Sequence, residues 1–331
     1  MQNMDNKSRL YYVDFLKFLG LSLIVLAHVD PPQWVIMLRC FDVPLMVILS
    51  SLLAQKSYIK NKNIFNYYIS RFKRLVLPTW IFLVIFFLIQ YIISGELFDL
   101  RYYIDTFLLT RYGLGYVWII LIYLYSAILV PLFNKMEFNF KNSMLIIIIY
   151  IIYEICYYYK VGINYRFIET TFYYIIPYGL LTYIGFNYNK STNKGKWVLT
   201  IVSMILFLLM GFYYYKVDGF FQIVQIAKYP ARLYYLAYGI IVSILLLIIC
   251  QKYNFKLFRN RIIIFISSHS MWIYLWHVLL IYIYKLLKLP QIWYLMFIIV
   301  YIGTILLVLI INKFIDIIEK KYQYSFWKYL R

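Results

Sequence analysis

The sequence predicts an all-α, polytopic membrane protein built as a bundle of about ten transmembrane helices. Of its 331 residues, 64% are hydrophobic, and its mean hydropathy is +0.74. A soluble domain of this length could not bury so much apolar surface. Apolar stretches long enough to cross a bilayer recur along the chain, with few long polar loops between them. We therefore expect one membrane-embedded domain over 1–331, with a short cytoplasmic tail from about 313.

Ten apolar runs are the candidate spans. In chain order they cover 12–29, 35–54, 75–94, 117–133, 143–159, 171–187, 197–215, 232–250, 263–284 and 292–312. Arg39 and Asp42 interrupt the second run, and the sixth contains Pro177 and Gly179. Such interruptions are tolerated where a span faces the interior of a bundle rather than lipid. The longest connecting loops are expected at 55–74 and 95–116.

The distribution of basic residues predicts the orientation in the membrane. With the N-terminus inside, about two thirds of the 33 Lys and Arg residues fall in inner segments, which places both termini in the cytoplasm of a cell-membrane protein. In a soluble protein the net charge of +20 would suggest a nucleic-acid partner. Here the basic residues lie between apolar runs, where they set topology and meet anionic lipid, so no nucleic-acid partner is expected.

The cysteines give no sign of a metal site. Cys40, Cys156 and Cys250 are isolated, odd in number and match no metal-binding spacing. The sequence also contains no glycine-rich phosphate loop that would support ATP-driven chemistry. We expect neither a metal nor a permanently bound cofactor.

The first span carries three ionisable side chains, Asp14, Lys17 and His28. Eleven helical steps of about 100° separate Lys17 from His28, so both point to one side, roughly 16 Å apart along the helix. Ionisable groups inside a bilayer are costly and usually face a polar cavity in which they act. We expect this side to face a wet passage inside the bundle, with His28 available as a general base.

A second candidate element precedes the third span. Arg71 and Arg74, at positions i and i+3, share one helix face, and two guanidinium groups there could clamp phosphate. The alternative is that they only mark the cytoplasmic side, as other basic residues nearby do. Combined with Lys17 at the cytoplasmic end of the first span, they predict an anion site on the inner face.

Buried carboxylates could neutralise these cations. Glu154 lies inside the fifth span and Asp42 at the interruption of the second. Each could pair with Lys17, Arg39 or His28, and Asp14 could pair with Lys17 from one turn away.

Two other histidines lie in the ninth span. His277, toward its outer end, is either an interfacial structural residue or a functional one, whereas His269 at its inner end is expected to be incidental.

Together these residues resemble the acyltransferase-3 family of ten-span membrane enzymes. Lys17 and His28 are similar to the Arg/Lys-x10-His pattern of the family's first helix. Arg71-x-x-Arg74 is similar to its inner-loop motif, and Tyr274-Leu-Trp-His277 to its late Tyr-Leu-x-His element. Further similarity lies in Phe41-Asp-Val-Pro44-Leu and in Trp118 through Tyr123 to Pro131.

The chain also departs from the family pattern. The departures are Lys17 in place of the more frequent Arg, Met46 and Ile119 in place of Phe, and Ser51 in place of Gly. They affect substrate details more than the fold.

The resemblance implies transfer of an acyl group, usually acetyl from acetyl-CoA, to a hydroxyl of a sugar or other acceptor. It implies His28 as the catalytic residue and Lys17, Arg71 and Arg74 as the donor-binding residues. The candidates for supporting roles are Asp14, Asp42, Glu154, Trp118, Tyr274 and His277. The expected partners are acyl-CoA, a glycan or other hydroxyl acceptor, and the lipid bilayer. A cell-surface polysaccharide, or its lipid-linked precursor, is the leading acceptor.

Several alternatives remain open at this point. Asp14 lies roughly 21 Å from His28 along the helix, so any group that orients His28 must come from another span. His28 could act as a general base or could itself be acylated in a ping-pong reaction. A transporter or flippase, or a polymerase, for lipid-linked glycan would have similar hydropathy. The absence of an internal sequence repeat counts modestly against a transporter.

Overall fold

The computed structural model describes residues 9–61, 63–253 and 255–322, and all regular secondary structure in this part of the chain is helical. The helices are α1 (Tyr11–Ala27), α2 (Gln33–Arg39), α3 (Asp42–Asn61), α4 (Ile64–Ser94), α5 (Leu100–Phe107), α6 (Trp118–Lys135), α7 (Phe140–Tyr158), α8 (Arg166–Asn187), α9 (Asn193–Asp218), η1 (Val224–Ala227), α10 (Leu233–Tyr253), η2 (Lys256–Arg259), α11 (Arg261–Ser268), α12 (Ser270–Leu286) and α13 (Trp293–Tyr322).

Every apolar run identified in the sequence coincides with one helix or with a pair of consecutive helices. By length and composition, seven helices in the described residues could cross a membrane, with α2 and α3 counted together, and an eighth results if α11 and α12 form one span. The remaining two runs correspond to α1, which has 17 residues, and α8. The chain is therefore an all-helical, multi-pass membrane protein.

Two of the predicted spans are split. Arg39 ends α2 and Asp42 begins α3, and their side chains form a buried ion pair across the junction. α11 and α12 meet at His269 and are bent by 80°. The continuous ninth span expected over 263–284 is thus wrong. At this bend, Ser267 contacts Asp14 of α1, and Ser268 contacts Arg9, which precedes that helix.

The loop expected over 55–74 is also wrong, because α3 runs to Asn61 and α4 begins at Ile64. The side chain of Asn63 caps α4 by accepting a hydrogen bond from the backbone N–H of Phe65. Arg71 and Arg74 therefore lie inside a long helix rather than in a loop.

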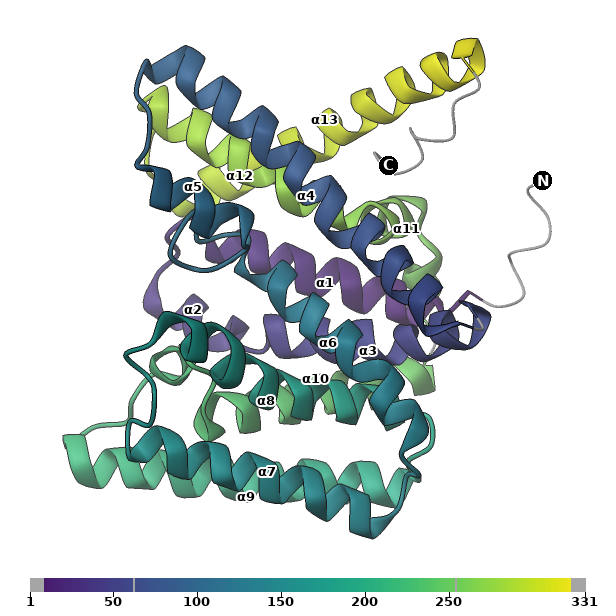
Figure 1. Ribbon diagram of the computed structural model, residues 1–331, viewed down its shortest axis with the longest axis vertical. Helices are drawn as coiled ribbons and strands as arrows, with labels where there is room; N and C mark the ends of the chain where they lie inside the picture. Colours follow the sequence, from purple (N-terminus) through teal and green to yellow (C-terminus); the bar gives the residue numbers. More distant parts are fainter. Residues whose placement is uncertain (1–8, 62, 254, 323–331) are drawn as a thin grey trace.

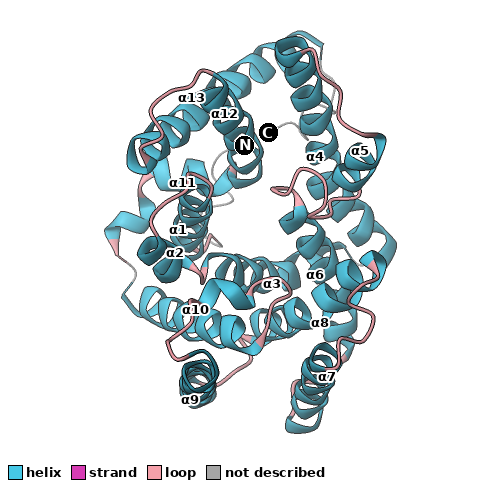
Figure 2. Cartoon of the chain, turned by 90° about the vertical axis from the view of Figure 1, so that its left-hand side faces the viewer, coloured by secondary structure: helices cyan, strands magenta, loops and turns pink. Residues whose placement is uncertain are grey.

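α3 lies at the centre of the bundle and packs against α1, α6, α8 and α10 (Figures 1 and 2). Its apolar side chains from Val43 to Leu52 include many that are completely buried. α9 packs against α10, and α7 packs against α8, at the periphery (Figure 2). Little of α7 or α9 is buried, although both are apolar, as expected for helices that face lipid.

α3 and α8 approach each other closely because Gly185 has no side chain. A Cβ atom at this position would collide with the backbone of Ile48 in α3. Small residues commonly allow this kind of backbone approach between membrane helices.

We predict that Gly185→Ala destabilises the protein by about 1–3 kcal/mol, since the backbone of Ile48 cannot move away as a flexible side chain could. Thermal unfolding in detergent micelles measures the effect. Gly211→Ala in α9 is the matched control, because the nearest atoms to its new Cβ would be 3.8 Å away. The control should unfold at the wild-type temperature or above it. Equal behaviour of the two variants would contradict the prediction.

Candidate active site

A cavity of about 500 Å³ lies between α1, α3, α4, α6 and the bend from α11 to α12. Its volume is within the roughly 300–1,000 Å³ that is typical of small-molecule sites. α1 contributes Lys17, Leu21 and Ile24, which are spaced by four and three residues and therefore share one helix face. His28 is the next residue on that face, one turn beyond the cavity wall. The side of α1 singled out in the sequence thus lines a cavity inside the bundle.

Positive charge is concentrated where α1 and α4 begin. Lys17, Arg71, Lys73 and Arg74 line the cavity, and none of its described lining residues is Asp or Glu. The Nε atom of Arg71 is buried without a hydrogen-bond partner, and its guanidinium group lies 5.0 Å from the centroid of the Tyr67 ring. The structure therefore brings Lys17, Arg71 and Arg74 to one cavity, where their combined field favours an anion.

Lys17 is held by a backbone carbonyl rather than by a carboxylate. Its Nζ atom donates to the carbonyl oxygen of Ser267 at 2.7 Å. This carbonyl belongs to the last turn of α11, where carbonyls have no partner within the helix. Asp14, which the sequence offered as a partner for Lys17, instead accepts from the hydroxyl of Ser267 at 2.6 Å and pairs with Arg9 at 2.7 Å.

His28 and His277 form a hydrogen-bonded pair at the far end of the same face of α1. The Nδ1 atom of His28 lies 2.8 Å from the Nε2 atom of His277, and the rings stack with an interplanar angle of 9°. His277 is completely buried within α12. His277 therefore lies inside the protein, and it is a hydrogen-bond partner of His28 that comes from another span.

The hydrogen bonds of His277 determine which ring nitrogens carry protons. The Nδ1 atom of His277 is hydrogen-bonded to the backbone carbonyl of Tyr274, and a carbonyl can only accept. In a neutral ring, Nε2 of His277 must then be an acceptor, so Nδ1 of His28 is the donor between the two rings. This leaves Nε2 of His28 unprotonated, which is the state that a general base requires.

Two tyrosine rings lie beside this histidine pair. Tyr274 lines the cavity, and its hydroxyl donates to the backbone carbonyl of Tyr116. The ring of Tyr116 meets His28 edge-on, with the ring centroids 4.7 Å apart. Burial raises the pKa of the Tyr116 phenol, so this neighbour of His28 stays neutral and does not compete as a base.

The remaining candidates for supporting roles do not line this cavity. Asp42 pairs with Arg39, which is one of the pairings considered. Glu154 is on α7, where it pairs with Arg232 at 2.7 Å, so the pairing of Glu154 with Lys17, Arg39 or His28 is wrong. Trp118 begins α6 and contacts the ring of Tyr229, with the ring centroids 5.1 Å apart.

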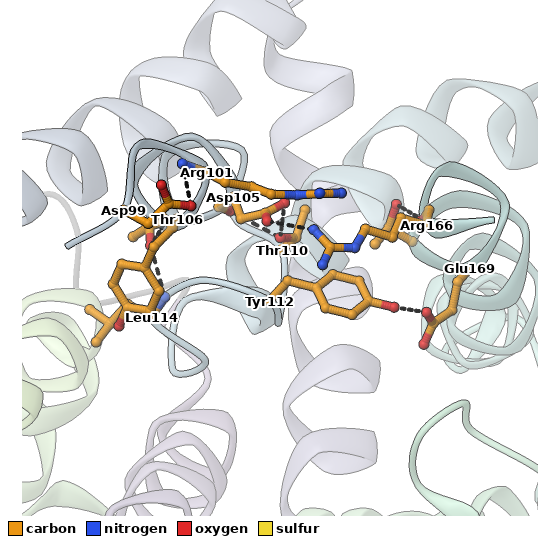
Figure 3. A network of polar contacts seen from close by, with 11 residues as sticks. Asp99, Arg101, Asp105, Thr106, Thr110, Tyr112, Leu114, Arg166 and Glu169 are labelled. Atoms are coloured by element: carbon orange, nitrogen blue, oxygen red, sulfur yellow. Dashed lines mark hydrogen bonds and ion pairs between the residues drawn. The ribbon is translucent and has the colours of Figure 1, made fainter. Parts of the chain in front are cut away.

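A polar network holds the segment that carries Tyr116 (Figure 3). Arg166 pairs with Asp105 at 2.9 Å, and the hydroxyl of Tyr112 donates to the carboxylate of Glu169. The hydroxyl of Thr106 accepts from the backbone N–H of Leu114 at 2.8 Å. These contacts connect α5 and the turn that follows it to the start of α8.

Sequence reasoning did not identify Tyr116, Tyr67 or Ser267 as parts of the site. Tyr116 and Tyr67 are two of 39 tyrosines, and nothing in their surroundings distinguishes them. Ser267 is separated from Lys17 by 250 residues in the chain. The pairing of His28 with His277 did have a signal, because only three histidines exist and both of these lie toward the outer ends of predicted spans.

Comparison with known proteins identifies the family. The family model described as an acyltransferase domain matches residues 10–313, which is most of the chain. No curated protein and no solved structure matches the chain. The matched region includes both histidines of the pair, the cations of the cavity and the bend from α11 to α12. The chain therefore belongs to the acyltransferase-3 family and is a membrane acyltransferase.

Proposed function

We propose that the protein transfers an acetyl or similar acyl group from cytoplasmic acyl-CoA to a hydroxyl of a cell-surface polysaccharide or of its lipid-linked precursor. The observation that carries this proposal is the hydrogen-bonded chain from His28 through His277 to the carbonyl of Tyr274. It prepares one ring nitrogen as a base, directly beyond a cavity whose other end is lined by cations.

The donor enters from the cationic end of the cavity. The phosphate groups of acyl-CoA bind Arg71 and Arg74, whose planar guanidinium groups suit phosphate oxygens, and Lys17 adds a third positive charge. The narrow pantetheine arm then follows the face of α1 formed by Lys17, Leu21 and Ile24. This path carries the thioester toward His28 and requires a shift of Tyr274 at the end of the cavity.

The chemical step needs only one base. The Nε2 atom of His28 removes the proton of the acceptor hydroxyl while its oxygen attacks the thioester carbonyl. The carbon–sulfur bond then breaks, and the imidazolium of His28 returns the proton to the departing CoA thiolate. The acceptor gains the acyl group, CoA leaves as the thiol, and the histidine regains its starting state.

The membrane orientation follows from the same assignment. We propose ten spans, counting α2–α3 and α11–α12 as one each, with the beginnings of α1 and α4 on the cytoplasmic side. Both termini are then cytoplasmic, which agrees with the excess of Lys and Arg in the inner segments.

We predict that His28→Ala lowers kcat for acetyl transfer by about 10²–10⁴-fold, as expected for loss of a general base. His277→Ala should lower kcat by about 10- to 100-fold, because the ring of His28 loses the partner that fixes its tautomer. His277→Gln should recover much of that loss, since its amide oxygen can still accept from Nδ1 of His28. Purified protein in liposomes, supplied with acetyl-CoA and a glycan acceptor, provides the assay.

Thermal stabilisation by CoA is the control for folding and should persist in all three variants. Undiminished transfer by His28→Ala would reject its catalytic role. Equal losses for His277→Ala and His277→Gln would reject the positioning role of His277.

A second prediction concerns the proposed binding site for the donor phosphates. Arg71→Gln and Arg74→Gln should each raise KM for acetyl-CoA by about 10- to 100-fold, because a charge-assisted contact to phosphate is worth roughly 1.5–3 kcal/mol. KM for S-acetylpantetheine, which lacks the phosphates, should not change. Arg101→Gln, an exposed arginine on α5, is the matched control. Parallel changes in KM for both donors would place the arginines away from the phosphates.

The proposed orientation is tested with an epitope tag at the C-terminus. In intact cells the tag should be inaccessible to antibody and protease, and it should become accessible once the membrane is permeabilised. Labelling of intact cells would place the C-terminus outside and reverse the assignment of the cationic end.

A further inference from the structure

A second group of buried cations lies beyond His28, at the end of the bundle opposite the beginnings of α1 and α4. Arg39, the last residue of α2, and Lys228, which follows η1, are each only 5% exposed. Asp42 is completely buried and pairs with Arg39. Within the described residues, no hydrogen bond or ion pair engages the Lys228 ammonium group. It lies 5.6 Å from the centroid of the Trp118 ring and 5.3 Å from that of Tyr229.

This arrangement leaves positive charge without compensation. Arg39 and Lys228 share one carboxylate, and a buried charge is costly unless it is paired. The Nε atom of Arg39 is also buried with no hydrogen-bond partner. Buried polar groups in native proteins are nearly always satisfied, so an orphaned donor together with an unpaired ammonium group suits an anionic ligand.

Buried hydroxyl groups surround the same place. The phenol oxygens of Tyr174 and Tyr178 have no hydrogen-bond partner among the described residues, and both rings contact Trp118 at 6.0 and 6.2 Å between ring centroids. The completely buried Tyr235 has an unpartnered phenol oxygen as well. Each phenol can donate and accept, which suits a ligand with several hydroxyl groups.

The cluster lies on the same side of the bundle as His28 and acts on it electrostatically. Besides the neighbouring ring of His277, the residues whose fields act on the ring of His28 are the cations Arg39 and Lys228. The proposed function assigns the donor phosphates to Arg71 and Arg74 at the other end of the cavity. Arg39 and Lys228 therefore remain available to bind the second substrate.

We propose that Arg39 and Lys228 bind an anionic group, a carboxylate or a phosphate, of the acceptor, and that the acceptor is an acidic sugar unit. Arg39 offers its free Nε–H, Lys228 offers a point charge, and the tyrosine hydroxyls contact the sugar. The inference rests on the proposed function for naming the ligand as the acceptor. The anion site itself rests only on the buried, unpaired groups.

Binding without transfer tests the anion site directly. Methyl glucuronide, glucose 1-phosphate and uncharged methyl glucoside are added to the detergent-purified protein, and thermal stabilisation is measured at low and high salt. We expect stabilisation by one or both acidic ligands, reduced at high salt, and none by methyl glucoside. Comparison of the two acidic ligands distinguishes a carboxylate from a phosphate.

Substitutions of Lys228 test whether this residue binds the acidic ligands. Lys228→Met should abolish the stabilisation by acidic ligands, whereas Lys228→Arg should keep it. Lys216→Met, which removes an exposed lysine at the end of α9, is the matched control and should behave as wild type. Without ligand, Lys228→Met should unfold at a higher temperature than wild type, because it removes an unpaired buried charge. Stabilisation of wild type by all three sugars equally, or by none, would overturn the proposal.

Transfer kinetics separate this proposal from the proposed function. With acetyl-CoA as donor, Lys228→Met should raise KM for the acidic acceptor at least tenfold and leave KM for acetyl-CoA unchanged. An equal fall in kcat for acidic and uncharged acceptors, without a change in KM, would place Lys228 at the thioester oxygen and overturn the proposal. Binding of acidic sugars with no transfer to any acceptor would preserve the anion site and reject the acyltransferase reaction proposed above.

Discussion

The hydrogen bond from Lys17 to the carbonyl of Ser267 joins the first helix to the bend between α11 and α12. The bend leaves backbone acceptors unpaired inside an apolar bundle, and the ammonium group needs an acceptor there, so each satisfies the other. Asp14 adds a contact to the same serine. With α1 fixed against α11 in this way, the other end of α1 meets α12, and His28 comes within hydrogen-bond distance of His277. The site depends on this attachment.

The charges that the bundle keeps inside are divided between its two ends. One group, with Arg71 and Arg74, lines the cavity, while the other, with Arg39 and Lys228, is almost completely buried near the histidine pair. Ionisable groups in a membrane bundle are expensive and are retained where they act. In the proposed reaction, two polar substrates meet at one base, His28. The two groups of cations lie on opposite sides of that base, one for each substrate.

The sequence predicted the helices well because each apolar run is long, and run length is a local property. The common face of Lys17 and His28 was also predictable, since it depends only on helical geometry. The bend at His269 was not, because its hydrophobic run continues and its stabilising contacts come from α1. The buried position of His277 and the pairing of Glu154 with Arg232 were missed for a similar reason. These contacts join segments far apart in the chain, which hydropathy cannot register.

The position of Tyr274 has a consequence for the cell as a whole. The cavity wall stops at Ile24 and Tyr274, and the phenol of Tyr274 is fastened to the backbone at Tyr116. In the proposed reaction, this contact separates the donor that enters the cavity from the opposite side of the membrane. The acyl end of the donor then reaches His28 only when Tyr274 shifts away from this contact. Under the proposed function, the same phenol that closes the cavity between turnovers also opposes leakage of ions across the membrane while no donor is bound.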